Sequence, residues 1–444
     1  MKLSEIIQAT DAKIIGNVDL ESEMKISTDT RTIENGDLYL PLKGANFDGE
    51  KFVEQAFEKG AIGAFCTTDN IFLDWVLEKE KFLLQVPDTL IAYLQLANFR
   101  RNKLNPKVVA ITGSSGKTTT KEIIASVLET KYKVFKTPLN YNNEIGLCQT
   151  IFSMPDDTEI LVLEMGMRGL GEIELLSKYA EPDITVISNV GTAHIGRLGS
   201  KENIARAKCE IVKYQRGNIF ISHDNELIKK VLNFSGEKIF YSFNDVKIFE
   251  KKSDYSKFEY QDNVYELNIG GDFNIENALS AINVAYALNL SVEQIQEGLK
   301  NYKSIEKRWE SVVSGGYQIV NDSYNANPES MKAFVDTVLE LYENKKVLIL
   351  GDMGELGSDE KIYHQEVGMY INDHKHLSDD ITILTVGCLG KYISDSVTNC
   401  NSKHFATIEN LVDYLQSAIS QDNKIFLKAS RSMKLERIID FLGN

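Results

Sequence analysis

A glycine-rich segment followed by a lysine and threonines is the clearest candidate for chemistry in this sequence. It separates a β-branched run from a helix-forming stretch and consists of Gly113, Ser114, Ser115, Gly116, Lys117, Thr118 and Thr119. In a strand–loop–helix unit, backbone N–H groups and the helix N-terminus can surround a phosphate. Lys117 would add a positive charge for the outer phosphates, and the Thr118 hydroxyl could bind magnesium. The usual phosphate-loop pattern has glycine where this chain has Ile111, so a turn without a ligand is the alternative.

Two further residues that could bind a metal follow apolar runs that predict β-strands. Glu164 ends the run ILVLE, and His194 follows ITVISNVGTA. The carboxyl ends of parallel strands share one edge of a sheet, so both side chains are expected near the phosphate loop. Magnesium favours oxygen ligands and allows imidazole. We therefore expect a magnesium site, with a solvated acid and a hydrogen-bonded structural histidine as the plainer alternatives.

Lys208 is unusual because it falls on the apolar face of a predicted helix, together with Ile204, Ile211 and Val212. Such a lysine either extends its amine to solvent or is desolvated, with a lowered pKa. A neutral amine can react with carbon dioxide to give a carbamate, an anionic oxygen ligand suited to a second magnesium ion. The spacing alone does not decide between these interpretations.

The elements that would position these residues divide the chain into three segments. Residues 1–102 mix short strand patterns with helical periodicity and predict a small α/β domain. Residues 103–309 begin with the strand, loop and helix of a parallel sheet, and residues 310–444 contain five strand patterns interleaved with helices. We expect an α/β protein with a central sheet like that of P-loop NTPases and a carboxy-terminal Rossmann-like, doubly wound domain.

Composition excludes several classes of protein. The 444 residues carry a net charge of −15, which argues against a general nucleic-acid binder. No apolar run approaches the roughly 18 residues of a membrane helix, and the start MKLSEIIQATDAK lacks the apolar region of a signal peptide. The five cysteines form no CxxC pair, which favours a reducing cytoplasm over a disulfide framework.

Distinctive motifs follow one another along essentially the whole chain: STDTRTIENGDLYLPLKGANFDGEKF, ITGSSGKTTTKE, LNYNNEIGLCQT, LEMGMRGLGEI, SNVGTAHIGRLGS, ENIARAKCEI, GDFNIENALSAINVA, KRWE, NDSYNANPESM, GDMGELG and LKASRSMKLE. In this order and spacing they resemble the Mur ligases of bacterial cell-wall synthesis. The resemblance implies an ATP-dependent amide ligase that uses ATP and two Mg²⁺ ions. NNEIG, EMGMRGLGEI and DSYNANP favour the activity that joins D-alanyl-D-alanine to UDP-N-acetylmuramoyl-tripeptide through an acyl phosphate.

The resemblance also implies roles for individual residues. Lys117, Lys208 and Arg308 would be catalytic, and Thr118, Glu164, His194 and a carbamylated Lys208 would bind the metals. Besides the phosphate loop and Arg308, ATP would contact Asn274, Asn277, Asp322 and Asn325, with Tyr324 beside them. The uridine-diphosphate sugar would lie against Ser27, Asp29, Thr30, Arg31, Lys43 and Asn46. Cys209 stands where the family more often has glycine, next to the lysine that would be modified.

Other interpretations remain open. Asn274 and Asn277 could be helix caps, and Asp29 to Arg31 could form a turn with a surface ion pair. GDMGELG could be an ordinary strand-to-helix turn. At the level of function, the alternatives are a sibling ligase that adds the third peptide residue, a folate glutamate ligase and a P-loop switch. We expect a cytoplasmic monomer without nucleic-acid or membrane partners.

Overall fold

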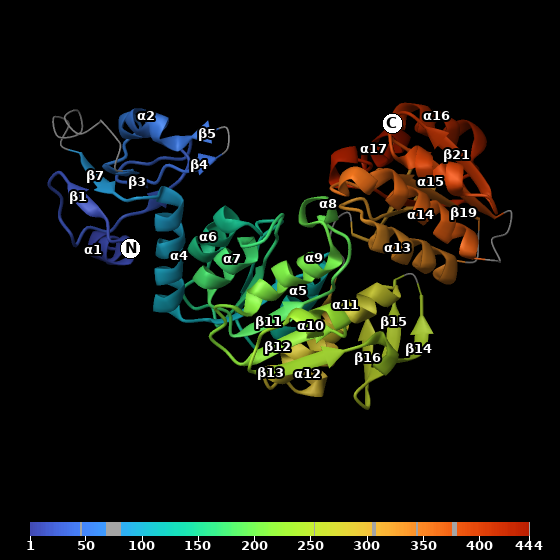
Figure 1. The fold of residues 1–444 in the computed structure, drawn as a ribbon, viewed down its shortest axis with the longest axis horizontal. Coiled ribbons are helices and arrows are strands. Elements are labelled where there is room, and N and C mark those ends of the chain that lie inside the picture. Colours follow the sequence, from blue (N-terminus) through green and yellow to red (C-terminus); the bar gives the residue numbers. More distant parts are fainter. Residues whose placement is uncertain are drawn as a thin grey trace. The chain divides into compact units, whose positions relative to one another are not determined.

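The computed structural model describes residues 1–44, 47–67, 81–252, 254–303, 308–342, 345–374 and 380–443. Asn46, one of the predicted sugar-binding residues, lies outside this range. The chain forms two compact units, one made of residues 1–106 and 137–158 and the other of residues 107–136 and 159–444 (Figure 1). Residues 137–158 therefore interrupt the sequence of the second unit but belong to the first, and we call them the excursion. The predicted α/β class is confirmed.

The first unit contains a five-stranded sheet of order β1-β7-β6-β3-β2, in which only the β1–β7 pair is antiparallel. Its strands are β1 (Lys13–Ile15), β2 (Ile26–Ser27), β3 (Leu38–Tyr39), β6 (Gly63–Cys66) and β7 (Phe82–Gln85), with a hairpin of β4 (Lys43–Gly44) and β5 (Phe47–Asp48). The helices are α1 (Leu3–Thr10), α2 (Val53–Glu58), α4 (Thr89–Leu104) and α6 (Glu144–Ser153). Helix α6 belongs to the excursion and packs against α4.

The second unit begins with a fully parallel six-stranded sheet of order β13-β12-β11-β8-β10-β9. Its strands are β8 (Lys107–Thr112), β9 (Val134–Lys136), β10 (Ile160–Glu164), β11 (Ile184–Ile187), β12 (Ile219–His223) and β13 (Glu237–Tyr241). Strand β8 lies between β10 and β11. The loops that follow these three strands therefore meet at one edge of the sheet, as predicted.

Helices on this sheet begin at recognisable signals in the sequence. Helix α5 follows Gly116, and Ser200 caps α9 by accepting a hydrogen bond from Asn203 N at 3.1 Å. The helices are α5 (Lys117–Leu128), α7 (Glu172–Ala180), α8 (Ile195–Leu198), α9 (Lys201–Cys209), α10 (Glu226–Val231), α11 (Asp272–Ala287) and α12 (Val292–Asn301). A separate antiparallel sheet contains β14 (Lys247–Lys251), β15 (Ser256–Tyr260) and β16 (Asn263–Leu267).

The carboxy-terminal part of the second unit contains another six-stranded sheet, of order β17-β18-β22-β19-β20-β21. Its strands are β17 (Glu310–Ser314), β18 (Tyr317–Asn321), β19 (Lys346–Gly351), β20 (Ile381–Val386), β21 (Asn401–Phe405) and β22 (Lys424–Lys428). Five are parallel, as predicted, and β17 adds an antiparallel edge that the sequence prediction lacked. The helices are α13 (Pro328–Leu341), α14 (Glu360–Asp373), α15 (Gly390–Ser396), α16 (Ile408–Ala418) and α17 (Arg437–Gly443).

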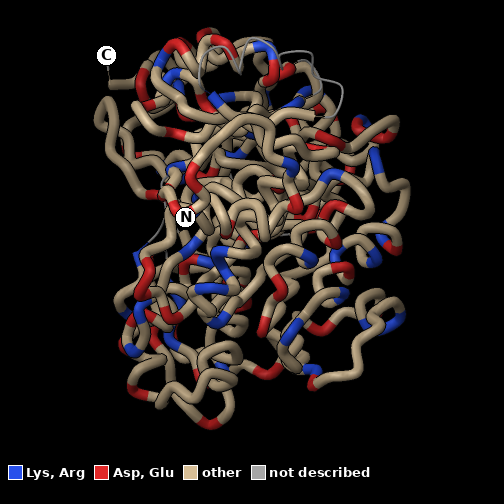
Figure 2. Tube along the Cα trace, turned by 90° about the vertical axis from the view of Figure 1, so that its left-hand side faces the viewer, with Lys and Arg blue, Asp and Glu red and all other residues tan. Residues whose placement is uncertain are grey.

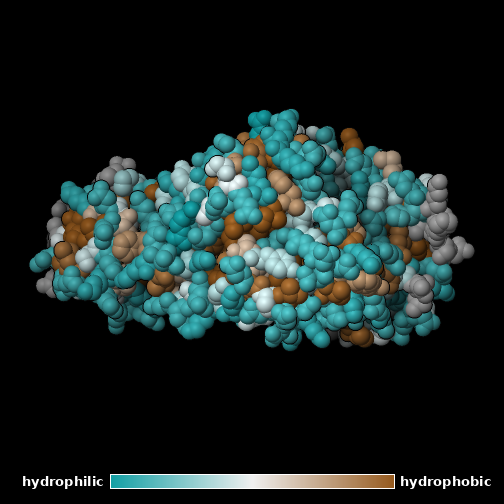
Figure 3. Space-filling view, turned by 90° about the horizontal axis from the view of Figure 1, so that it is seen from below, coloured by the Kyte–Doolittle hydropathy of each residue, from teal (hydrophilic) through white to brown (hydrophobic). Residues whose placement is uncertain are grey.

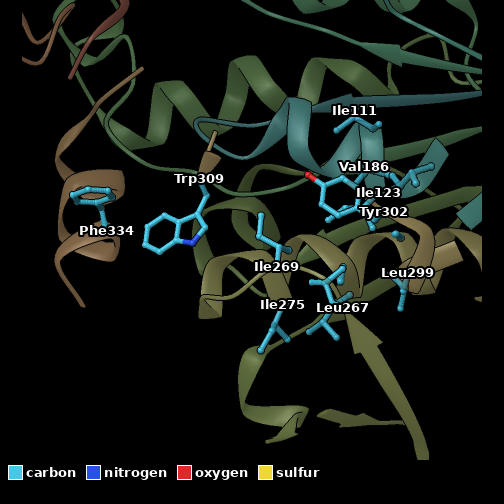
Figure 4. Packing of buried hydrophobic residues seen from close by; sticks show 14 of the residues in the cluster. Ile111, Ile123, Val186, Leu267, Ile269, Ile275, Leu299, Tyr302, Trp309 and Phe334 are labelled. Carbon is cyan, nitrogen blue, oxygen red and sulfur yellow. The ribbon is translucent and has the colours of Figure 1, made fainter. Parts of the chain in front are cut away.

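One hydrophobic core continues from the central sheet into the carboxy-terminal part of the second unit. The buried indole of Trp309 connects them, since its ring centroid lies 5.8 Å from that of Phe273 on α11 and 5.7 Å from that of Phe334 on α13. Figure 4 shows Trp309 facing Phe334, with Ile269 and Ile275 nearby. This contact ties α13 to the central part of the unit.

Surface charge and hydropathy are mixed. Acidic and basic positions are interspersed along the trace in Figure 2. On the face that Figure 3 shows, hydrophilic residues predominate and hydrophobic residues form small groups. Within the described ranges, no helix is long and apolar enough to cross a bilayer.

Gly298 on α12 provides a test of the packing beneath the phosphate loop. A Cβ at this position would lie 2.4 Å from Cα of Val127 on α5, so an added methyl group must displace backbone. We expect Gly298→Ala to lower the free energy of unfolding by about 1–3 kcal/mol, measured by urea denaturation. The exposed neighbour change Glu297→Ala should stay within about 0.5 kcal/mol of the parent. Equal stability of the two variants would contradict the close approach.

Candidate functional site

The predicted phosphate loop adopts a conformation that only glycine fits at two positions. Gly116 has φ +74°, and a Cβ there would lie 2.5 Å from Asn277 Oδ1. At Gly113 a Cβ would lie 1.9 Å from Ser188 Oγ. The loop leads directly into α5, whose first-turn N–H groups have no carbonyl partners within the helix. Thr119 is buried in this turn. These features provide the backbone cradle that a phosphate needs.

Residues 188–194, which follow β11, hold the loop in this conformation, and we call this segment the collar. Asn189 Oδ1 accepts hydrogen bonds from Ser114 N at 3.0 Å and Ser115 N at 2.9 Å, and Asn189 Nδ2 donates to Ser115 Oγ at 2.7 Å. Ser188 Oγ donates to Ser115 O at 2.7 Å, and Gly191 N donates to Ser114 Oγ at 2.8 Å. Sequence analysis missed Asn189, since the pairing of β11 with β8 is what brings it to the loop.

Thr118 is the centre of a polar contact that also includes Glu164 and Arg308. Thr118 Oγ1 donates to Glu164 Oε2 at 2.7 Å and accepts from Arg308 Nη2 at 2.9 Å. Lys117 Nζ donates to Gly113 O at 3.0 Å. Desolvation lowers the pKa of Lys117, and the nearby Arg308 adds to this effect. The predicted catalytic and metal-binding side chains at the ends of β8 and β10 therefore do lie together.

Lys208 lies inside α9 with only 1% of its surface exposed. Burial lowers its pKa well below the ordinary value, and the positive charge of Lys117 contributes to the same shift. Within the described part of the chain, no hydrogen bond or ion pair involves Nζ of Lys208. The structure thus favours a desolvated amine over one that extends to solvent. Cys209 beside it is also buried, and burial raises the pKa of its thiol to about 12.

His194, the other predicted metal ligand, forms an ion-pair contact with Glu355. It caps the short helix α8 with φ +66°, and its Nδ1 lies 2.6 Å from Glu355 Oε2. This contact holds the pKa of the Glu355 carboxyl below its ordinary value. Glu355 belongs to the GDMGELG motif, so that motif does more than turn the chain. Among the residues that the structure describes, no three His, Cys, Asp or Glu side chains form a metal-binding cluster.

The predicted nucleotide-side asparagines have partners in α5 and in the turn before α11. Asn277 Oδ1 accepts from Thr120 Oγ1 at 3.0 Å, next to Gly116. Asn274 Nδ2 donates to Gly270 O at 2.7 Å, and both side chains are buried. Neither residue is the N-cap, which is Gly271. The alternative of simple N-caps is therefore wrong for both residues, and Asn277 lies beside the phosphate loop.

The carboxy-terminal candidates make two sets of contacts, one at the ring of Tyr324 and one at Lys428. The guanidinium of Arg308 lies 3.9 Å from the centroid of this ring. Asp322 Oδ2 accepts from Lys428 Nζ at 2.5 Å, and Lys428 also donates to Asn325 O at 3.3 Å. Lys428, which sequence analysis did not single out, therefore fixes the loop that contains Asp322 and Asn325. Its signal was the motif LKASR at the end of the last strand.

In the first unit, the predicted sugar-binding residues lie around β2 and the turn after it. Arg31 Nη2 lies 2.6 Å from Asp29 Oδ2, and this ion pair lowers the pKa of Asp29 to about 2. Ser27 is buried in β2, whereas Lys43 is exposed in β4. Thr30 Oγ1 donates to Gln55 Oε1 at 3.1 Å. The structure thus contains the turn with a surface ion pair that was the alternative to a binding role, and the binding role stays a prediction.

Two charged residues near the site were not predicted. Lys121 is fully buried, with its Nζ 3.8 Å from Glu164 Oε2 and 3.2 Å from Glu122 Oε1. It follows Lys117 by four residues, so the helical period alone could have placed it on the same face of α5. Glu329 on α13 accepts hydrogen bonds from Thr192 in the collar. This contact joins residues far apart in the sequence, and no local pattern indicates it.

Comparison with known families places the whole chain near one group of proteins. Residues 25–99 match the description "Mur ligase family, catalytic domain", residues 111–285 match "Mur ligase middle domain", and residues 307–431 match "Mur ligase, glutamate ligase domain". The phosphate loop and collar fall within the second match, and Arg308 and the loop of Asp322 fall within the third.

Individual relatives agree with these matches. The chain is 38% identical to the UDP-N-acetylmuramoyl-tripeptide--D-alanyl-D-alanine ligase of Bacillus subtilis (strain 168), over 93% of this chain and 92% of the relative. The crystal structure of MurF from Acinetobacter baumannii superimposes with a TM-score of 0.85 at 29% identity, covering 99% and 98% of the two chains. MurF from Thermotoga maritima in complex with ADP gives a TM-score of 0.83 at 27% identity, covering 95% and 97%.

Asn189 allows the role of the collar to be tested. Asn189→Ala removes three hydrogen bonds to the phosphate loop, so the loop should sample conformations that do not bind phosphate. We expect the affinity for ATP, measured by calorimetry, to fall about tenfold. Asn410→Ala, an exposed change on α16, serves as the control and should leave the affinity unchanged. Unaltered ATP binding by Asn189→Ala would mean that the collar does not shape the loop.

Proposed function

This chain belongs to the Mur ligase family, and on that premise we propose that it joins D-alanyl-D-alanine to UDP-N-acetylmuramoyl-tripeptide. The products are UDP-N-acetylmuramoyl-pentapeptide, ADP and phosphate, in the synthesis of peptidoglycan precursors. The relatives that carry this name and match over nearly the full length support the assignment. The observation that carries it is the joint placement of the phosphate loop, Glu164, Arg308 and Lys208.

Amide formation from a carboxylate and an amine is unfavourable in water, so the carboxylate must be activated. In the proposed reaction the terminal carboxylate of the tripeptide attacks the γ-phosphate of ATP, which gives an acyl phosphate and ADP. This attack brings two anions together and needs nearby positive charge. We propose that Lys117, which contacts the phosphate loop, and Arg308, which contacts Thr118, supply it. The amine of D-alanyl-D-alanine then attacks the acyl carbon, and phosphate leaves.

Magnesium fits the side chains of Glu164, at the end of β10, and Thr118, at the start of α5. The hydroxyl of Thr118 and the carboxylate of Glu164 are hard oxygen donors held 2.7 Å apart, and both side chains are buried beside the phosphate loop. We propose that these two residues bind the first ion, which would neutralise phosphate charge when bound. We assign His194 and Lys208 to a second ion. The ADP complex of the Thermotoga maritima relative supports the use of ATP.

Carbamylation would convert the buried amine of Lys208, which lies near the cation Lys117, into an anion. A neutral amine is the form that reacts with carbon dioxide, and the lowered pKa of Lys208 favours that form. The product carries a negative charge, which would attract Lys117 instead of repelling it. Carbamylated Lys208 would then offer an oxygen ligand for magnesium.

We propose that each of the three segments binds a different ligand. We propose that residues 1–102 bind the UDP-sugar through Ser27, Asp29, Thr30, Arg31, Lys43 and Asn46. Residues 103–309 would bind ATP and the metals. Residues 310–444 would complete the ATP site through Asp322 and Asn325 and bind the dipeptide. We also propose that the protein is a monomer and that the reaction takes place in the cytoplasm, where ATP is available.

A phosphate-release assay tests the function. We expect phosphate only when ATP, UDP-N-acetylmuramoyl-tripeptide and D-alanyl-D-alanine are all present, with the pentapeptide product identified by mass spectrometry. Lys117→Ala should reduce this rate by at least about a hundredfold, because the charge that faces the transferred phosphate is lost. Release with glutamate or a diamino acid as the amine would instead indicate a sibling ligase. Hydrolysis without any carboxylate substrate would indicate a P-loop switch.

Lys208→Ala tests the carbamate. The variant should lose most ligation activity, and added acetate or formate should restore part of it by supplying the missing carboxylate. Arg206→Ala, at an exposed cation on the same helix, serves as the control and should show no gain from these anions. Normal activity of Lys208→Ala without added acid would exclude a carbamate role.

A further inference from the structure

Glu329 forms a contact between helix α13 and the collar. Its Oε2 accepts hydrogen bonds from Thr192 N at 3.0 Å and from Thr192 Oγ1 at 2.5 Å. Its other oxygen, Oε1, lies 3.1 Å from Lys201 Nζ at the start of α9. Burial alone would raise the pKa of Glu329, but the hydrogen bonds from Thr192, from a backbone N–H of its own helix and from Lys201 together hold the pKa below the ordinary value. The carboxylate is therefore charged at neutral pH.

The collar, which Glu329 contacts through Thr192, also contacts the phosphate loop. One residue before Thr192, Gly191 N donates to Ser114 Oγ. A Cβ at Gly191 would lie 3.1 Å from Glu329 Oε2, so the collar backbone passes closely around the carboxylate. Two residues after Thr192 comes His194. A shift at Thr192 would therefore move both the backing of the phosphate loop and a proposed metal ligand.

Helix α13, which carries Glu329, is fixed at its start by an N-cap and further along by packing. Asn327 caps the helix by accepting from Ser330 N at 2.8 Å, and Pro328 occupies its first position. Further along the helix, Phe334 packs on Trp309, as Figure 4 shows. The position of Glu329 thus depends on the packing of the carboxy-terminal part against the central part.

We propose that Glu329 is a positioning residue for phosphoryl transfer: it sets the collar, and through it the phosphate loop, when α13 is packed in place. The inference rests on the proposed function. It assigns Glu329 no contact with ATP, magnesium or either substrate. Its effect should appear in turnover and not in the first binding of ATP, since Asn189 holds the loop independently of Glu329.

The test compares Glu329→Ala with a matched control, Glu409→Ala. Glu409 is likewise the second residue of its helix, α16, and pairs with Arg437 at 2.9 Å. Both changes remove a first-turn acid and one ion pair, but only Glu329 contacts the collar. We expect Glu329→Ala to lower kcat about ten- to a hundredfold, the effect of losing charge-assisted hydrogen bonds. Its dissociation constant for ATP should change less than about twofold, and its Tm should match that of Glu409→Ala.

Two more variants connect the effect to Thr192. Glu329→Gln retains one oxygen that can accept from Thr192, so its kcat should lie between those of the parent and Glu329→Ala. Thr192→Val removes the hydroxyl donor but keeps the N–H. In the double variant with Glu329→Ala, Thr192→Val should cause no further loss, because the bond it removes is already absent.

Several results would overturn the proposal. Equal kcat for Glu329→Ala and Glu409→Ala would show that the contact is only structural, and additive losses in the double variant would show that Glu329 does not act through Thr192. Recovery of Glu329→Ala by raised Mg²⁺ would identify a metal ligand instead. The unmodified protein, assayed in parallel, separates the two hypotheses: if it does not ligate, the proposed function fails, whereas the comparison of variants tests Glu329.

Discussion

The site depends on two desolvated lysines near one another: Lys208 is buried in α9, and Lys117 is half-buried at the start of α5. Desolvation lowers the pKa of both Lys117 and Lys208, and the positive charge of Lys117 lowers the pKa of Lys208 further. Such an arrangement is stabilised by anions, and the carboxylate of Glu164 supplies part of the compensation. A polyanionic substrate and a carbamate would supply more. Under the proposed function, a few desolvated cations would attract the negatively charged substrates, so a protein with a net charge of −15 would need no basic surface.

Much of the site follows from the strand order of the central sheet. Because β8 lies between β10 and β11, the phosphate loop has Glu164 on one side and the collar on the other. The sequence could predict the first neighbour, since apolar runs, glycines and a terminal acid are local signals. Helical spacing also placed Lys208 on the apolar face of its helix, but it left open whether the amine reaches solvent, and the structure shows that it is buried. These predictions hold because the period of a helix or strand fixes direction regardless of tertiary context.

The contacts that the sequence did not predict are those made by ordinary polar residues across long separations. Asn189 and Glu329 belong to no strong local pattern, and their roles depend on which loops meet. The edge strand β17 was missed because its exposed and half-buried residues lack an apolar run. The Asp29–Arg31 pair shows the opposite limit: the sequence singles out these residues, but an ion pair within a turn accounts for their geometry, and their binding role stays a prediction.

The excursion of residues 137–158 determines which parts of the chain can be separated from one another. The polypeptide passes between the two units at three places, after residues 106, 136 and 158. With a single connection each unit would be one continuous segment, whereas three connections make both units discontinuous in sequence. The same topology means that no single cut liberates the first unit, since a fragment ending at residue 106 would lack α6 and uncover the face of α4 that α6 packs against. An isolated first unit therefore requires a spliced chain in which residue 106 is joined to residue 137.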